Sequence, residues 1–305
     1  QPIENAGDGT EVAVICDVTA FHAEGGGQLG DIGTITAPTG VIEVTVTKKL
    51  PDGATIMVGN VVEGVVNVGE EVTFAVQSNR KNDIARNHTA THLLHAALKQ
   101  VLGSHVNQAG SYVGPERLRF DFSHFSQVTE AELKEVEAIV NEEILAGKDV
   151  AIEELPIEEA KKRGATALFG EKYGDVVRVV TVPEFSMEFC GGSHVSNTAQ
   201  IGMFKIISEA STGAGVRRIE AVTGHGAVEH VNATEAMVKG LAAELKCRVN
   251  DVPARLEALK AELKAIQNKA DELAAQIAKA QVSNVDDQVR DLKGAPALVQ
   301  KVEAD

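Results

Sequence analysis

The chain has 305 residues, of which 44% are hydrophobic, and it carries a net charge of −15 at pH 7. A chain of this length can bury two or more hydrophobic cores, and its length alone predicts about two domains. It contains no stretch long and apolar enough for a transmembrane helix, and its N-terminus lacks a secretory signal. We therefore expect a cytoplasmic protein with reduced thiols.

Residues 1–80 show the alternation of apolar and polar residues that is typical of β-strands. Glycine-rich turns separate three such runs, whose apolar positions are Val12, Val14, Cys16 and Val18, then Ile42, Val44 and Val46, then Val72, Phe74 and Val76. Short alternating runs with turns between them predict a small all-β barrel. Cys16 has no second metal ligand nearby in the sequence, which favours an ordinary buried thiol.

Three consecutive glycines, Gly25, Gly26 and Gly27, lie between two of these runs. Glycine lets a backbone pass close to a ligand, because it has no side chain to obstruct the approach. The spacing does not specify phosphate binding, so from these residues alone a flexible hairpin is the better interpretation.

The apolar period changes to that of a helix at Ser78, and Gly103 is the predicted end of that helix. His88 and His92 are four residues apart, so their imidazoles project from one face within reach of a single cation. A lone pair of histidines at this spacing is more often packed in a core than bound to metal. Thr89 stands where HExxH zinc proteases carry their glutamate, which argues against that class.

A second helix is predicted after Thr129. Thr129 and Glu132 have the spacing of a capping box and precede an apolar run of helical period. Strands are expected at Val176–Val182 and Met203–Ser208. Helices that alternate with strands after an all-β region indicate an α+β fold.

A second ligand pair, Cys190 and His194, lies in the segment FCGGSH and repeats the four-residue spacing of the histidine pair. Imidazole nitrogen and thiolate sulfur together suit Zn²⁺, and this chain places one of only three cysteines in this short motif. The two pairs together therefore predict a zinc site far more strongly than either pair alone.

The last segment, residues 226–305, has the pattern of a long helix or helical hairpin, with helix expected from about Val228 to Val289. Its apolar residues recur at alternating steps of three and four, as in a coiled-coil seam. The seam consists of Leu256, Leu259, Leu263, Ile266, Ala270, Leu273, Ile277 and Ala280. Pro253 interrupts the pattern, so VPAR is predicted to be a turn, and Cys247 is an ordinary thiol. Packing on its own domain and a homodimer seam are equally compatible with this pattern.

Several segments together resemble the editing domain of alanyl-tRNA synthetases. They are NHTATHLLHAALKQVLG, LRFDFSH, LFGEKYGD, FCGGSHVSNTAQIGMFKI and GVRRIEAVTG. The resemblance covers roughly residues 1–225, in the order that the family uses. Threonyl-tRNA synthetases and freestanding alanyl-editing proteins have a similar zinc-binding core, but the barrel-like segment before it and the helix after it favour the full synthetase as parent.

The resemblance implies a deacylase that hydrolyses the ester of tRNA(Ala) mischarged with serine, with glycine as a second candidate. The parent would be an alanine–tRNA ligase whose synthetic domain is absent here. One Zn²⁺ would be held by His88, His92, Cys190 and His194. Gln108, otherwise a surface loop glutamine, matches the discriminating position of the family, and Gly26 and Gly27 match a loop near the active site. His95 is outside the family's ligand pattern, so we expect it to be packed or to contact a ligand.

The resemblance also implies three domains. These are a β-barrel at residues 1–80, an α+β zinc-dependent editing domain at 81–225, and a helical, coiled-coil-like linker at 226–305. The segment APALVQKVEAD would be the start of a missing C-terminal domain.

The negative charge is unusual for a protein that binds RNA, because most such proteins are basic. Contact confined to the acceptor end of tRNA(Ala) needs only a few local cations, since it follows a short single strand. Arg217 and Arg218 are the candidates, with Lys205 and Arg119 behind them. Surface ion pairs are an equal alternative for these arginines.

The sequence leaves the general base and two rival functions open. Glu24 and Asp121 are eligible carboxylates, but neither has a spacing that assigns it the role. One rival function is a freestanding trans-editing deacylase, and the other is a non-catalytic, zinc-stabilised RNA-binding module. The length of the gene addresses the first rival, and a deacylation assay with charged tRNA addresses the second.

Overall fold

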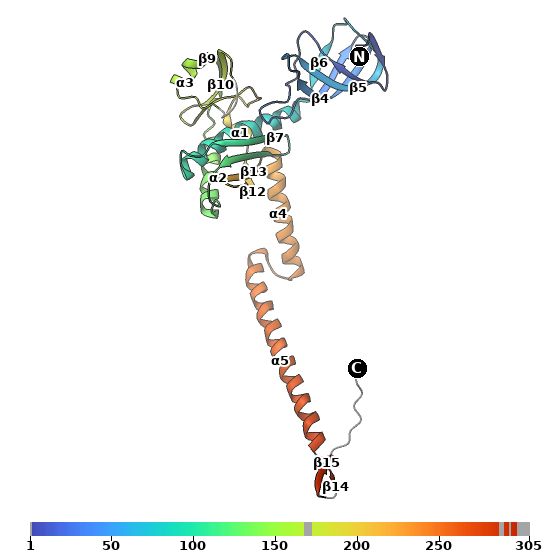
Figure 1. The fold of residues 1–305 in the computed structure, drawn as a ribbon, viewed down its shortest axis with the longest axis vertical. Coiled ribbons are helices and arrows are strands. Elements are labelled where there is room, and N and C mark those ends of the chain that lie inside the picture. Colours follow the sequence, from blue (N-terminus) through green and yellow to red (C-terminus); the bar gives the residue numbers. More distant parts are fainter. Residues whose placement is uncertain (1, 168–172, 287–289, 293, 298–305) are drawn as a thin grey trace. The chain divides into compact units, whose positions relative to one another are not determined.

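A computed structural model describes residues 2–167, 173–286, 290–292 and 294–297. The chain forms two compact units, Gln1–Val231 and Asn232–Asp305, and the boundary between them falls within helix α4 (Gly224–Glu244). Strands and helices are both abundant in the first unit (Figure 1), so the prediction of an α+β fold is confirmed. No helix in the described part of the chain is long and apolar enough to cross a bilayer.

The N-terminal sheet has six antiparallel strands in the order β1-β5-β4-β3-β6, with β2 also paired to β5. Its strands are β1 (Asn5–Gly7), β2 (Glu11–Val14), β3 (Gly33–Ala37), β4 (Gly40–Lys49), β5 (Thr55–Asn67) and β6 (Thr73–Val76). The sheet encloses its own core, in which Ile35, Ile42 and Met57 are buried. The prediction of all-β structure for this region is therefore confirmed.

Two details of this sheet differ from the alternation in the sequence. Strand β2 ends at Val14, and Val18 lies outside the sheet with 77% of its surface exposed. Beyond Val18, the Thr19 hydroxyl accepts a hydrogen bond from the backbone N–H of Phe21, outside the sheet. In β4, a register shift after Val44 leaves Val46 half-buried and turns Thr47 into the interior.

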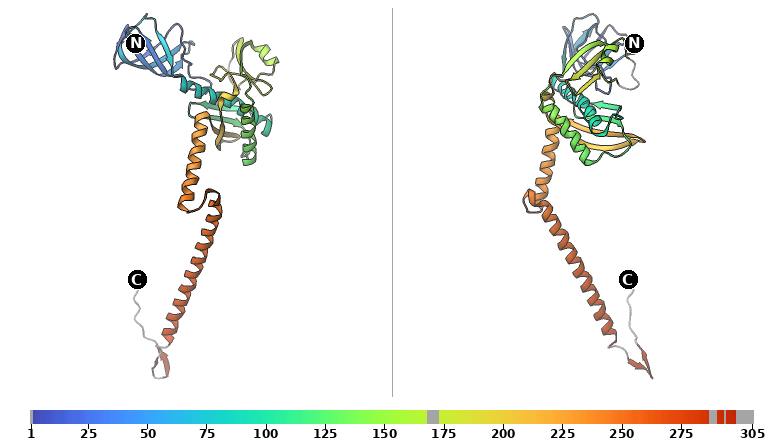
Figure 2. Two further views of the ribbon diagram at one scale, coloured as in Figure 1. Left: turned by 180° about the vertical axis from the view of Figure 1, so that it is seen from behind. Right: turned by 90° about the vertical axis from the view of Figure 1, so that its left-hand side faces the viewer.

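A second, four-stranded sheet follows helix α1 (Ser78–Leu102) and has the order β12-β13-β8-β7. Its strands are β7 (Gln108–Val113), β8 (Leu118–Ser123), β12 (Phe204–Gly213) and β13 (Val216–Thr223). Helices α1 and α2 (Glu130–Leu145) cover one face of this sheet (Figure 2), and Leu94 and Leu98 of α1 are buried in one core with Phe120 of β8. A short helical turn, η1 (Thr198–Ile201), packs on both helices.

The helix boundaries follow local chemistry. Helix α1 ends where the backbone N–H of Gly103 donates to the carbonyl of Lys99, as predicted from the glycine. Helix α2 begins with the predicted capping box, in which the Thr129 hydroxyl accepts from the N–H of Glu132 and the Glu132 carboxylate accepts from the N–H of Thr129.

A third sheet of three strands has the order β11-β10-β9 and carries the cysteine motif. It consists of β9 (Ala151–Pro156), β10 (Val176–Val182) and β11 (Ser186–Phe189), with helix α3 (Ile157–Lys162) after β9. The strand predicted at Val176–Val182 is confirmed, and the strand predicted from Met203 begins one residue later, at Phe204. The motif LFGEKYGD begins with residues 168–172, which lie outside the described residues.

The second unit contains the remainder of α4, the short turn η2 (Val249–Asp251), α5 (Val252–Asp286), and the strands β14 (Arg290–Leu292) and β15 (Ala295–Ala297). The predicted helices are present, but the turn precedes VPAR, because Pro253 is in the first turn of α5. Proline is tolerated there, since the first N–H groups of a helix have no intrahelical acceptor. The predicted helix end at Val289 and most of APALVQKVEAD lie outside the described residues.

Candidate metal centre

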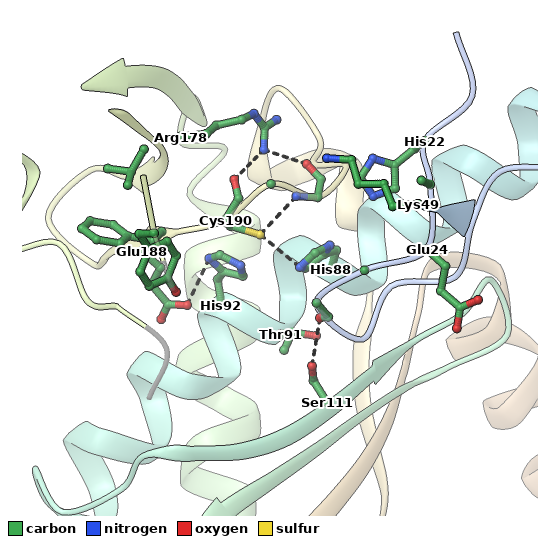
Figure 3. Close-up of a pocket in the computed structure, with 18 of the residues that line it drawn as sticks. His22, Glu24, Lys49, His88, Thr91, His92, Ser111, Arg178, Glu188 and Cys190 are labelled. Carbon is green, nitrogen blue, oxygen red and sulfur yellow. Dashed lines mark hydrogen bonds and ion pairs between the residues drawn. The ribbon is translucent and has the colours of Figure 1, made fainter. Parts of the chain in front are cut away.

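Four side chains from two distant segments meet at one point of the first unit. Helix α1 supplies His88 and His92, and the loop that follows β11 supplies Cys190 and His194. Their ligand atoms all lie within 4.8 Å of one another. The sulfur of Cys190 is 3.3 Å from Nε2 of His88 and 3.2 Å from Nε2 of His194. Figure 3 shows His88 and His92 turned from the helix toward the sulfur.

Each histidine of the cluster has its Nδ1 atom next to an oxygen of a neighbouring side chain. Nδ1 of His88 is 2.7 Å from Oε1 of Gln28, and Nδ1 of His194 is 3.1 Å from the hydroxyl of Thr89. Nδ1 of His92 is 3.3 Å from Oε2 of Glu188, an ion-pair contact without hydrogen-bond geometry. Such outer partners orient imidazoles that bind metal.

His95 lies outside the cluster but shares one of these partners. Its Nδ1 is 2.8 Å from Oε1 of Glu188, and its ring is buried against Phe120. Glu188 thus contacts both His95 and His92. His95 is therefore packed and linked to a proposed ligand, as expected from the sequence.

The electrostatics of the cluster favour a thiolate surrounded by positive charge. Burial raises the pKa of the Cys190 thiol, but the charge of His88 and hydrogen bonds from His194 and His88 outweigh burial and bring it far below its usual range. Burial lowers the pKa of His92, but Glu188 and Cys190 outweigh burial and raise it to about 9. Burial and the charge of His88 lower the pKa of His194 to about 3. A divalent cation would stabilise the thiolate in the same way, because it also places positive charge beside the sulfur.

The loop between the cysteine and the histidine is fixed by an arginine and a glycine. The Arg178 guanidinium donates to the carbonyls of Cys190 and Gly192 at 2.7 and 2.8 Å (Figure 3). A Cβ atom at Gly192 would overlap the ring of His88 and lie 2.7 Å from Oε1 of Gln28. Only glycine therefore allows the loop to lie this close to the helix.

A cleft of about 630 Å³ opens beside the cluster. His88, His92 and Cys190 line it, and so do Gln108 and Gly26, two other residues singled out in the sequence. His22, Glu24, Lys49, Ser111, Arg178 and Glu188 also line it.

The glycine loop forms one wall of this cleft, but its closest backbone approach is to strand β7. The carbonyl of Gly26 accepts from the Ser111 hydroxyl at 3.2 Å, and that of Gly27 accepts from the N–H of Val113 at 2.8 Å. Gly27 has a φ of 83°, and a Cβ there would overlap Ser111. The same strand presents Gln108, whose amide donates to the Ser111 hydroxyl at 3.2 Å.

The four candidate cations for tRNA contact are engaged in ion pairs. Arg218 forms two hydrogen bonds with Asp121, at 2.6 and 2.8 Å, and Arg119 lies 3.6 Å from the same carboxylate. The remaining pairs are Arg217 with Glu209, at 2.7 Å, and Lys205 with Glu137, at 2.7 Å. None of these residues is among the described residues that line the cleft. Of the two candidate bases, Glu24 lines the cleft, whereas Asp121 holds Arg218.

Sequence reasoning missed the four residues that support the ligands: Gln28, Thr89, Arg178 and Glu188. In the sequence, Thr89 was informative only as the missing glutamate of a protease, yet its hydroxyl lies 3.1 Å from Nδ1 of His194 and accepts from the N–H of Val195. The signal that could have suggested Glu188 and Thr89 is their position within two residues of a ligand. No local pattern points to Gln28 or Arg178.

Comparison with known proteins agrees with this geometry. A family described as "Threonyl and Alanyl tRNA synthetase second additional domain" matches residues 177–220, which include Cys190 and His194. A second family, "tRNA synthetases class II (A)", matches residues 1–80. These two matches identify a segment of a class II tRNA synthetase of the threonyl and alanyl kind.

Individual relatives show which family within this class of synthetases the chain resembles. The chain is 50% identical over 304 residues to the alanine–tRNA ligase of Bacillus subtilis, and 49% identical over 304 residues to that of Bacillus velezensis. It is 47% identical over 302 residues to the alanine–tRNA ligase of Listeria monocytogenes serotype 4b. These matches cover 99 to 100% of this chain but only 34 to 35% of each relative, so the chain spans about a third of their length. The chain belongs to the alanine–tRNA ligase family.

Proposed function

We propose that this chain is the editing part of an alanine–tRNA ligase and hydrolyses the ester of tRNA(Ala) mischarged with serine, with glycine as a second candidate. The observation that carries the proposal is the cleft that joins the histidine–cysteine cluster to Gln108 and the glycine loop. A volume of about 630 Å³ is within the range of small-molecule sites and suits the aminoacyl end of a tRNA. The editing domain would comprise residues 81–225, between a β-barrel at 1–80 and a helical linker at 226–305, in the cytoplasm.

The cluster fits one Zn²⁺ held by His88, His92, Cys190 and His194. Three imidazoles and a thiolate are a zinc donor set, and outer partners orient all three rings. When bound, zinc would supply positive charge that polarises the ester carbonyl or orients the aminoacyl group.

The side chains of the cleft have distinct proposed roles. Editing is needed because a synthetic site shaped for a methyl side chain cannot strongly exclude serine or glycine. A second site that hydrogen-bonds the serine hydroxyl can hydrolyse the serine ester and spare the alanine ester. Alanine has no hydroxyl, so its binding would leave the polar group of the site unpaired. Gln108 has the amide for this recognition. Of the two candidate carboxylates, Glu24 is the better placed to accept a proton from water, because it lines the cleft and Asp121 is bonded to Arg218.

A deacylation assay tests the proposal directly. Purified protein is incubated with seryl-tRNA(Ala), glycyl-tRNA(Ala) and alanyl-tRNA(Ala), and the ester that survives is measured over time. We expect rapid loss of the seryl ester and survival of the alanyl ester. If tRNA binds but all three esters survive, the protein is the non-catalytic RNA-binding module instead.

Contact with tRNA through Arg217 and Arg218 requires them to exchange partners, because both are paired with carboxylates. Replacing both arginines with glutamine would weaken tRNA binding if phosphate takes the place of the carboxylates. The same change would leave binding unaltered if the arginines only support the sheet.

The seam of α5 is proposed to mediate a homodimer. Leu263 and Ile266 occupy adjacent seam positions, and 65% and 67% of their surfaces are exposed in the single chain. Changing both to lysine places charge in the interface, so we expect dimerisation to be lost in analytical ultracentrifugation across a concentration series. The control changes Ala261 and Asn268, on the opposite side of the helix, to lysine and should still dimerise. A wild-type protein that stays monomeric at high concentration contradicts the seam.

A further inference from the structure

Gln28 is a polar side chain with no exposed surface, and it belongs to the loop between β2 and β3 rather than to the segments that carry the metal ligands. We infer that Gln28 is a positioning residue, which fixes the tautomer of His88 and ties the loop Cys190–His194 to helix α1. This inference rests on the zinc site of the proposed function. It assigns the N-terminal sheet region a direct part in forming that site.

The hydrogen bonds around Gln28 determine which atom carries each proton. The backbone N–H of Ser193, 2.8 Å from Oε1 of Gln28, can only donate, so Oε1 must be an acceptor. Nδ1 of His88 is 2.7 Å from the same oxygen and must therefore carry a hydrogen. When the ring is neutral, as a metal ligand must be, its lone pair is then on Nε2, the atom 3.3 Å from the sulfur of Cys190. This is the tautomer that a metal at the cluster requires.

The second atom of the amide strengthens this assignment. Nε2 of Gln28 is 3.2 Å from the Ser193 hydroxyl, which can accept the hydrogen bond. A rotated amide would direct its NH₂ group at the backbone N–H of Ser193, which can only donate. The orientation of Gln28 therefore follows from its neighbours.

The backbone of Gln28 is held from both sides, so the side chain is pre-positioned. Its N–H donates to the carbonyl of Gly25 at 3.0 Å, and its carbonyl accepts from the N–H of Gly25 at 3.1 Å. The neighbours of Gln28 bind strand β7: the carbonyl of Gly27 accepts from Val113, and the N–H of Leu29 donates to Val113. The glycine turn is thus fastened to the strand that also carries Gln108, and a fixed scaffold suits a residue that orients a ligand.

Three variants test this role through zinc affinity, measured by competition with a chromophoric chelator. Gln28→Met keeps the length but removes the acceptor, and we expect the zinc dissociation constant to rise by roughly 10- to 100-fold. Gln28→Glu keeps an acceptor for His88 and Ser193, so its affinity should stay within a few-fold of wild type. Gln100→Met, at an exposed position of α1, is the matched control and should bind as wild type does.

A spectroscopic measurement on the wild-type protein avoids dependence on the folding of the variants. In protein labelled with ¹⁵N-histidine and loaded with zinc, His88 should keep a proton on Nδ1 and bind metal through Nε2 in long-range ¹H–¹⁵N spectra. Any one of three results would overturn the role of Gln28. These are metal binding through Nδ1 of His88, equal loss of zinc affinity in the methionine and glutamate variants, and unchanged zinc affinity in the methionine variant. Absence of zinc binding by the wild type would overturn the proposed metal site as well, whereas loss of deacylation alone would not affect this inference.

Discussion

The variant in which Cys190 and His194 are both replaced by alanine is expected to contain no stoichiometric zinc, against one ion per chain in the wild type. The change removes two of four ligand atoms, including the only sulfur, and leaves two imidazoles on one face of α1. Two imidazoles cannot fill the tetrahedral shell that zinc adopts in closed protein sites. Metal analysis of the purified and dialysed protein gives the number of ions per chain.

The matched control for this experiment is Cys247→Ala, which removes a free thiol from the second unit. It should keep one zinc per chain, so that loss in the double variant cannot be ascribed to removal of a thiol in general. Zinc that persists unchanged when Cys190 and His194 are absent would reject the assignment of these ligands.

Gln108→Leu is expected to slow hydrolysis of seryl-tRNA(Ala) by roughly 10- to 100-fold, because a lost hydrogen bond that leaves a buried polar group unpaired costs about 1–3 kcal/mol. Leucine is similar in size but cannot pair with the serine hydroxyl. Gln108 has no hydrogen bond to a ligand side chain and bonds instead to Ser111, so zinc content should stay the same. Single-turnover deacylation measures the rate, and metal analysis of the same sample measures the zinc.

Gln100→Leu provides the control for this substitution, since Gln100 is an exposed glutamine of α1 that does not line the cleft. It should hydrolyse seryl-tRNA(Ala) as fast as the wild type. Equal rates for the wild type and the Gln108 variant would remove Gln108 from the recognition of serine. A parallel loss of zinc would instead make its role structural.

The sequence was sufficient for features that depend on neighbours along the chain. The spacing of His88 and His92 fixes their common face once a helix is formed, and the capping box at Thr129 needs only four consecutive residues. The meeting of this pair with Cys190 and His194 could be expected from ligand chemistry and family resemblance, although the segments are far apart. Zinc itself and the role of Gln108 are still predictions.

Other features that depend on distant contacts could not be predicted from the sequence. The pairing of β2 with β5 ends at Val14, so the alternation that continues to Val18 was misleading. Pro253 suggested a break, yet at the start of a helix proline is compatible with helical structure. Gln28 gave no signal, because its function depends on Ser193 and His88, which only the folded chain brings to it.

The side chains of Gln28 and Ser193 are in contact although they are 165 residues apart in the sequence. This separation sets the order in which the parts of the site can form during translation. The strands β1–β6 pair among themselves, so the N-terminal sheet can form as soon as β6 has emerged. At the usual speed of synthesis, roughly 10–30 s then pass between the emergence of Gln28 and that of Ser193. Of the four proposed ligands, only His88 and His92 are present in the emerged chain for most of this interval. Tight capture of an ion from the cellular pool is therefore a late step, timed by the growth of the chain.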